Sequence, residues 1–213
     1  EWGSGGEDDG WLASGIEETI TSALDGWQGS AVFSEYGYER NPEIPITFPA
    51  FEYTGPEHNR RGAWRGAFCG MGVINGFENT WGPRMDLAHH QEGVLYFELL
   101  RRFFTEVVPF HRLNPHPELL IPAEYETGHT PRVMATDEMD VVTVYVPAAD
   151  PFSLDLPFEG LTAQWYDPRN GEVRSARVHQ EGDAFRFVPP NDAPGSGYPP
   201  DWVLTISKPV LSR

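Results

Sequence analysis

The sequence has 213 residues, of which 39% are hydrophobic and 13% aromatic, and this content is too high for a disordered chain. The 32 acidic and 15 basic residues give a formal net charge of −17. This charge argues against binding to nucleic acid or to an anionic membrane surface, because both need clustered Lys and Arg. No apolar run is long enough to span a membrane, so we expect no membrane contact. A neutral polysaccharide is compatible with the charge.

The first predicted helix begins at Ser14, which forms a capping box with Glu17. Apolar residues then recur at helical spacing as far as Trp27, and Gly29 ends the helix. A short apolar strand, Ala31–Phe33, follows at once. This helix–strand order is typical of a parallel sheet. The N-terminus shows no basic region followed by an apolar one, so no signal peptide is visible.

The strand at Ala31–Phe33 reads as buried on both faces and is followed by a carboxylate, Glu35, and a glycine, Gly37. This pattern is typical of the C-terminal end of a barrel strand, where (β/α)8 enzymes keep their catalytic groups. A carboxylate held there fits the nucleophile of a glycosidase that acts with retention. The alternative is a structural ion pair of Glu35 with Arg60 or Arg61, and the residues alone leave both readings open.

Glu39, four residues beyond Glu35, is the second candidate carboxylate, and it reaches the cleft as an acid behind the nucleophile if the turn after the strand folds back. Tyr36 and Tyr38 are placed to donate hydrogen bonds to the nucleophile or to sugar hydroxyls, or simply to pack. Trp81 is a candidate platform on which a sugar ring stacks, and its alternative is a place in the core. We rank Glu39 below Glu35.

The next stretch predicts two strand–helix units. Residues 40–58 contain four prolines and read as an extended loop of the kind that builds a substrate cleft. Residues 60–68 are predicted to be helical, and residues 71–77 form a second buried strand that delivers Trp81 just beyond its end. Residues 92–107 have the spacing of an amphipathic helix.

The composition changes near residues 109–122, where prolines accumulate, and we place the domain boundary there, giving domains 1–115 and 116–213. Asp167–Gly171 is a turn in which Pro presets φ and Asn-Gly supplies positive φ. The strand-like runs of the second domain are 141–146, 161–166, 172–178, 184–188 and 202–206. The predicted fold class is therefore α/β plus all-β, with the C-terminal part of a (β/α)8 TIM barrel followed by a small antiparallel β-sandwich.

Other chemistries are poorly supported. Cys69 is the single cysteine, so it forms no intramolecular disulfide, and its apolar neighbours favour a buried structural thiol. His89 and His90 are adjacent and therefore point apart, and no ligand set forms with His111 or His116, so we expect no metal. Nucleotide-binding and serine-hydrolase motifs are absent from the sequence, so we expect no cofactor.

Several motifs taken together resemble a known family. Ser34–Glu39 resembles the Glu-x-x-Tyr-Glu segment of the apiosidase-like glycoside hydrolases, which are glycoside hydrolase family 140 and its relatives. Arg60–Gly70 is similar to the helix and glycine turn that follow in that family. The other similar segments are Asn75–Trp81, Gln91–Gly93, and, in an attached β-sandwich of the type named a collagen-binding domain, Trp165–Gly171, Pro189–Pro190 and Asp201–Leu204.

The resemblance implies a clan-A (β/α)8 hydrolase that acts with retention on a plant, algal or bacterial polysaccharide and is secreted or periplasmic. Glu35 matches the nucleophile after the seventh strand, and Trp81 becomes a subsite wall. The expected substrate-binding residues are Tyr36, Tyr38, Glu39, Arg60 and Trp81.

Six barrel strands, including the one expected to carry the acid/base, have no counterpart here. We therefore expect the N-terminal barrel portion on a separate or cleaved chain, or outside these residues. The alternative is a non-catalytic carbohydrate-binding or adhesion protein that keeps a barrel remnant.

Overall fold

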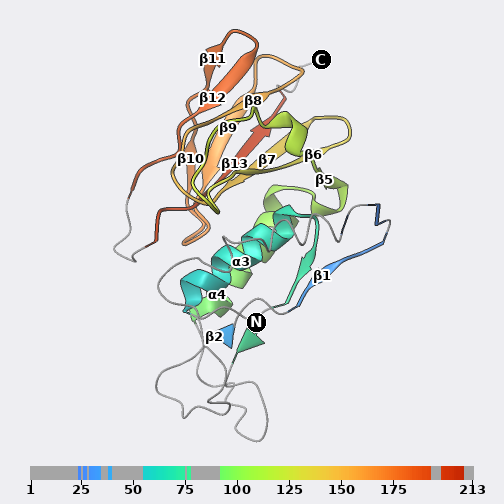
Figure 1. Ribbon diagram of the computed structural model, residues 1–213, viewed down its shortest axis with the longest axis vertical. Helices are drawn as coiled ribbons and strands as arrows, with labels where there is room; N and C mark the ends of the chain where they lie inside the picture. Colours follow the sequence, from blue (N-terminus) through green and yellow to red (C-terminus); the bar gives the residue numbers. More distant parts are fainter. Residues whose placement is uncertain are drawn as a thin grey trace, which may run out of the picture. The chain divides into compact units, whose positions relative to one another are not determined.

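Two short pairs of parallel strands lie in the first part of the chain. Strand β1 (Val32–Phe33) pairs with β3 (Gly72–Val73), and β2 (Tyr38–Glu39) pairs with β4 (Gly76–Phe77). Parallel strands need a crossover connection, and helix α3 (Pro56–Phe68) supplies it (Figure 1). The predicted strand–helix–strand order and its parallel pairing are therefore confirmed.

These elements belong to a computed structural model that divides into two compact units, Glu1–Leu100 and Arg101–Arg213. The boundary that the sequence places after residue 115 stays a prediction. The structure describes residues 24, 26–27, 29–34, 38–39, 55–74, 76–77, 92–192 and 198–208.

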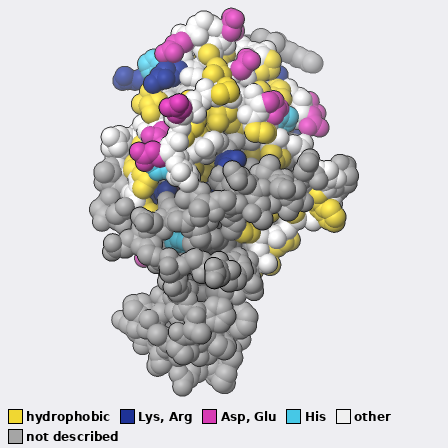
Figure 2. Space-filling view, viewed as in Figure 1, with side chains coloured by type: hydrophobic (Ala, Val, Ile, Leu, Met, Phe, Trp, Pro, Cys, Tyr) yellow, Lys and Arg dark blue, Asp and Glu magenta, His cyan; other side chains and the backbone are white. Residues whose placement is uncertain are grey.

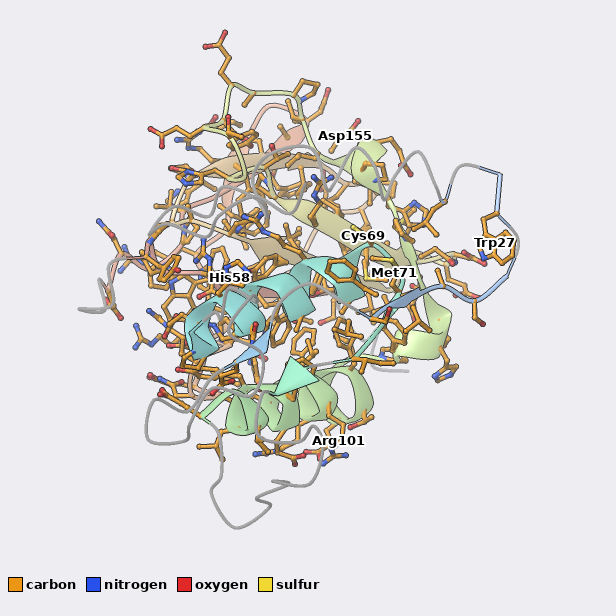
Figure 3. All side chains as sticks on the ribbon, turned by 60° about the horizontal axis from the view of Figure 1, so that its bottom comes forward. Trp27, His58, Cys69, Met71, Arg101 and Asp155 are labelled. Carbon is orange, nitrogen blue, oxygen red and sulfur yellow. The ribbon has the colours of Figure 1, made fainter. Side chains whose placement is uncertain are left out.

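Helix α3 begins four residues earlier than predicted, with Pro56 in its first turn, where a missing backbone N–H costs nothing. It packs on β1 through Gly66: a Cβ added there would stand 2.8 Å from Cδ1 of Phe33, so only glycine allows this approach. Figure 3 shows His58 near one end of α3 and Cys69 at the other. The helix ends at Phe68, and Gly70, just after the C-cap residue Cys69, has a φ of 80°, which suits glycine.

The prediction that the Ala31–Phe33 strand is buried on both faces is wrong, and the second predicted strand, residues 71–77, is only partly buried among its described residues. The side chains of Val32 and Ile74 are 56% and 55% exposed, although Phe33 is partly buried under Gly66. Within the described residues, each of these strands has a single partner strand. The face of the β1–β3 pair that carries Val32 and Ile74 is therefore open to solvent. A run of apolar residues in the sequence does not show which face of a strand is covered.

The helix predicted over residues 92–107 is present as α4 (Glu92–Arg102), followed by a π-helical turn, Phe103–Val107. The buried residues of α4 are Gly93, Tyr96 and Leu100, which lie on one face of the helix. Leu95, one residue before Tyr96, is 64% exposed. The amphipathic helix is confirmed, and its apolar face is narrower than the spacing indicated.

The second unit is built from antiparallel strands in two sheets. One sheet has the strand order β10-β9-β13-β7-β6-β5, and the other has the order β11-β12-β8. Its strands are β5 (Leu113–Pro115), β6 (Arg132–Thr136), β7 (Val141–Val146), β8 (Phe152–Asp155), β9 (Thr162–Tyr166), β10 (Val173–Ser175), β11 (His179–Glu181), β12 (Ala184–Phe187) and β13 (Trp202–Ser207). Two 3₁₀ turns, Phe110–Arg112 and Pro117–Leu119, flank β5.

The two sheets share one hydrophobic core, so the predicted β-sandwich is confirmed as an architecture. Alternate residues of β7 (Val142, Val144, Val146) belong to this core, as the period of two in a strand requires. Phe152 of the three-stranded sheet stacks on Phe187 at 5.7 Å between ring centroids. It also meets the six-stranded sheet edge-on, at 6.3 Å from the ring of Trp165.

The surface of the second unit reflects the acidic composition. Figure 2 shows acidic side chains at several separate places on its visible face, interspersed with hydrophobic and basic groups.

Among the helices that the structure describes, none has the length and apolar character needed to cross a membrane.

Candidate functional site

The predicted site residues are described to different extents. Glu35, Tyr36 and Trp81 lie outside the described residues, so their predicted roles stay predictions. The backbone of Tyr38 forms part of β2, and its side chain is outside the description. Glu39 and Arg60 are described in full, and the site is built from them.

Glu39 is the last residue of β2 and stands opposite Phe77 of β4. Its side chain is 2% exposed, and its Oε1 accepts a hydrogen bond from the backbone N–H of Gly93 at 3.1 Å. Gly93 is in the first turn of α4, where the helix dipole favours a carboxylate. A Cβ on Gly93 would collide with Oε2 of Glu39, so the carboxyl group occupies the space that a side chain would need. That Oε2 has no hydrogen-bond partner among the described residues.

Burial raises the pKa of Glu39, and the neighbouring charge of Glu92 raises it further. The Gly93 N–H and the side chain of Asn59 act in the opposite direction on this pKa and are outweighed. The neutral acid is therefore favoured over a wider pH range than for an ordinary Glu. A carboxyl group held in this way at the end of a parallel strand is suited to donating a proton or a hydrogen bond.

The two strand pairings differ in the number of residues between them. Four residues, 34–37, separate β1 from β2, whereas two residues, 74–75, separate β3 from β4. The first strand region thus has two extra residues between its paired positions, and Glu35 is within that stretch of sequence.

Arg60 belongs to a buried cluster that joins α3 to α4. Its Nη2 lies 2.5 Å from Oε2 of Glu57, and its guanidinium stands 4.8 Å from the centre of the Tyr96 ring. The Tyr96 hydroxyl donates to Oε1 of Glu92 at 3.0 Å. Burial and these carboxylates raise the pKa of Tyr96, which keeps its hydroxyl protonated as a donor. Arg60 thus has a structural partner in Glu57, and its role in substrate binding stays a prediction.

The sequence reasoning missed Glu57, Glu92, Gly93 and Tyr96. Two of their contacts have a local signal, since Glu92 and Tyr96 are four residues apart and Glu57 precedes Arg60 by three. The contact between Glu39 and Gly93 spans 54 residues and has no such signal.

Other groups offer little chemistry. Burial raises the pKa of the Cys69 thiol to about 11, so it is a poor nucleophile at neutral pH. Within the described ranges, no group of three or more His, Cys, Asp or Glu side chains is arranged to hold a metal ion. In the second unit, Asp201 is fully buried and accepts a hydrogen bond from the Tyr145 hydroxyl at 3.1 Å.

Two of the solved structures with a similar fold are glycoside hydrolases. One, titled "Glycoside hydrolase", has 16% sequence identity and a TM-score of 0.70, and the match covers 97% of this chain and 49% of that one. The other, a glycoside hydrolase family 5 protein from Bacteroides vulgatus, has 17% identity and a TM-score of 0.68, with 89% and 44% covered. The chain shares its fold with these proteins. It spans about half of their length.

The second unit also matches a family model. Residues 115–207 match the model described as "Putative collagen-binding domain of a collagenase". The resemblance of the β-sandwich to this type of domain is therefore confirmed. The assignment to glycoside hydrolase family 140 stays a prediction. A comparison with curated proteins gave no match.

Proposed function

We propose that this chain is the C-terminal part of the (β/α)8 barrel of a retaining glycoside hydrolase, followed by an accessory β-sandwich. The observation that carries the proposal is the parallel pairing of β1 with β3 and of β2 with β4 across α3. This pairing places a strand that ends in a buried carboxylate, Glu39, in a parallel arrangement, in a chain whose fold is shared with glycoside hydrolases. Within that class, the apiosidase-like enzymes have the most similar motifs.

In the proposed mechanism the Glu35 carboxylate attacks the anomeric carbon, and the bond to the leaving sugar breaks. A second carboxylic acid, supplied from outside these residues, gives its proton to the departing oxygen. Water then attacks the covalent glycosyl-enzyme, the same group takes the proton, and Glu35 is released as a carboxylate. Retention requires the two carboxyl groups to stand about 5–5.5 Å apart. The sequence pattern favours Glu35 for this role, because it follows shortly after a short apolar strand.

The proposed substrate is a neutral polysaccharide of plant, algal or bacterial origin, met in a secreted or periplasmic location. Trp81 would stack on a sugar ring, while Tyr36, Tyr38 and Arg60 would donate hydrogen bonds to its hydroxyls. The net charge of −17 disfavours an anionic polymer as substrate.

The proposed partner is the remaining part of the barrel, on a separate or cleaved chain or elsewhere in the same polypeptide. The exposure of Val32 and Ile74 supports it, because parallel strands are normally covered on both faces. Because each of these side chains is about half exposed, covering it with added strands would contribute about half of the roughly 1.5–3 kcal/mol of full burial.

Covalent labelling tests the proposal. The protein, with the segment that completes its barrel, is treated with a panel of 2-deoxy-2-fluoroglycosyl fluorides and digested for mass spectrometry. We expect one sugar attached to the peptide that contains Glu35. Glu35→Gln should abolish both labelling and turnover while polysaccharide binding is kept, and Glu39→Gln, the matched control, should still be labelled. Labelling of another residue, or turnover by Glu35→Gln, would refute the assignment.

The match of residues 115–207 to a collagen-binding type of domain favours a second candidate, a non-catalytic carbohydrate-binding or adhesion protein. It predicts that wild type and Glu35→Gln bind a polysaccharide or fibrillar collagen equally well. It also predicts that neither is labelled. The two candidates therefore give opposite results in the same experiment.

A further inference from the structure

The Glu39 carboxyl group lies where β2, α3 and α4 meet, and the proposed mechanism does not use it. The group comes from β2, the backbone N–H of Gly93 in α4 donates to it at 3.1 Å, and the Asn59 side chain of α3 interacts with it. It is 2% exposed, and its Oε2 has no hydrogen-bond partner among the described residues. No cation is among the groups that act most strongly on it. A carboxylate buried in this way is costly, and the neutral acid is less so.

The charged groups of the two helices at this junction do not favour a further negative charge. Glu92 of α4 repels a carboxylate at Glu39. Its Oε1 accepts from the Tyr96 hydroxyl at 3.0 Å, and Oε1 of Glu57 in α3 lies 3.3 Å from the same hydroxyl oxygen. A hydroxyl has one proton, so the two carboxylates compete for one donor. Arg60 of α3 pairs with Glu57 through Nη2.

We propose that this junction is a proton-operated joint: the neutral Glu39 carboxyl group holds the first turn of α4 on β2 and α3, and its ionisation releases that turn. The inference does not rest on the proposed function, because the groups that make up the joint take no part in the proposed chemistry. It concerns the first unit alone.

The close fit around the carboxyl group explains why ionisation should open the joint. A Cβ on Gly93 would collide with Oε2 of Glu39, so the carboxyl group already fills the space beside the helix backbone. A carboxylate can therefore be hydrated only if the side chain leaves this place. The Gly93 N–H then loses its acceptor, and an N–H in the first turn has no partner within its own helix.

The direction of the pH response follows from the same surroundings. Burial and the charge of Glu92 raise the pKa of Glu39 above its ordinary value of 4.5. The joint is therefore fully closed below that value and loses stability as pH rises through the folded pKa. Because one proton is involved, the loss is at most about tenfold in the opening equilibrium per pH unit.

The experiment is hydrogen exchange of single amides in the full chain, followed by NMR from about pH 4 to about pH 8. At each pH the observed rate is divided into the rate of an unstructured chain, which gives a protection factor free of the pH dependence of exchange itself. In wild type the protection of the Gly93 amide should fall as pH rises. The amides of Ala63 in α3 and Val144 in β7 should show no comparable fall.

Three variants separate the joint from other causes. Glu39→Gln is neutral at every pH and keeps an oxygen that accepts from Gly93, so protection at Gly93 should not depend on pH. Glu92→Gln keeps an acceptor for the Tyr96 hydroxyl but removes the repelling charge, so the fall at Gly93 should be smaller than in wild type. Glu106→Gln, the matched control, removes a carboxylate from an exposed ion pair and should behave as wild type.

Each contrary result overturns the inference. Protection at Gly93 that stays constant or rises with pH in wild type would show that ionisation of Glu39 does not release the helix. A fall of the same size in Glu39→Gln would assign the response to another group. An equal fall at Ala63 would show that α3 and the start of α4 open together, with no separate joint at the start of α4.

Discussion

The turn between β9 and β10 is organised by one buried carboxylate, and replacing it should destabilise the second unit strongly. Asp167 is 2% exposed. Its Oδ1 accepts from the backbone N–H and the Nε of Arg169 at 2.9 and 2.7 Å, and its Oδ2 accepts from Nη2 at 2.9 Å. The Arg169 guanidinium in turn stands 5.2 Å from the centre of the buried Trp202 ring.

Asp167→Ala leaves the Arg169 charge, on a side chain 13% exposed, without its carboxylate. Breaking a buried ion pair by removing one partner costs about 3–5 kcal/mol, and the lower figure applies because Arg169 keeps some contact with water. For a domain of this size 1 kcal/mol corresponds to about 4 °C in Tm, so the transition of the second unit should fall by about 12 °C.

Differential scanning calorimetry of the full chain and a urea titration provide the measurements. Asp192→Ala is the matched control, because Asp192 also pairs with an arginine of this hairpin, Arg174, but on the exposed surface. Its cost should stay within about 1 kcal/mol. The double variant Asp167→Asn/Arg169→Met should recover part of the loss, since it removes both charges. A cost for Asp167→Ala below about 1 kcal/mol, or equal to that of Asp192→Ala, would refute the reasoning.

Three further predictions concern single sites. Gly66→Ala should lower the stability of the first unit by about 1–2 kcal/mol in urea titrations. The added methyl group would overpack against Phe33, and this cost exceeds the gain in helix propensity. A stabilised variant would contradict the packing of α3 on β1. Tyr145→Phe should cost about 1.5–3 kcal/mol, since the buried Asp201 carboxylate loses a donor, and a cost within the error of the titration would contradict that bond's contribution. Glu39→Gln should change the pH dependence of unfolding. The raised pKa of Glu39 means that its contribution to stability is full below the ordinary value of 4.5 and is lost as pH rises through the folded pKa. The Gln variant should therefore lose less stability than wild type over that range, and identical slopes would show that Glu39 titrates normally.

The sequence predicted some strands of the sandwich and missed others, among them β5 (Leu113–Pro115) and β6 (Arg132–Thr136), although Val133, Met134 and Ala135 of β6 are buried. Val141–Val146 was predicted with its observed bounds because β-branched residues dominate it. Strand β11 (His179–Glu181) was missed, since its three residues are polar and exposed and it is a strand only through pairing with β12. Strand β8 (Phe152–Asp155) has two buried residues and follows directly after Pro151, so four residues gave too little periodicity to identify it.

The start of α3 was placed too late for a different reason. His58 and Asn59 are polar, so they gave no apolar period, yet both are buried in the structure, as is Arg60 after them. Arg60 is accommodated by Glu57 within the helix and by the Tyr96 ring from α4. Polar residues can occupy a buried helix face when their partners come from another element, and those partners are distant in sequence.

The same limit explains the ranking of the two carboxylates. The sequence pattern asks only for a carboxylate close after an apolar strand, and both Glu35 and Glu39 have such a position. What distinguishes Glu39 is a glycine 54 residues later, whose missing side chain admits its carboxyl group to a buried place at the start of α4. A carboxyl group held by a helix N–H and shielded from water is fixed in position, which suits an anchor better than a nucleophile that must approach a sugar carbon. The surroundings of Glu39 thus favour an anchoring role for this residue. The reacting role of Glu35 stays a prediction, and covalent labelling is the measurement that checks it.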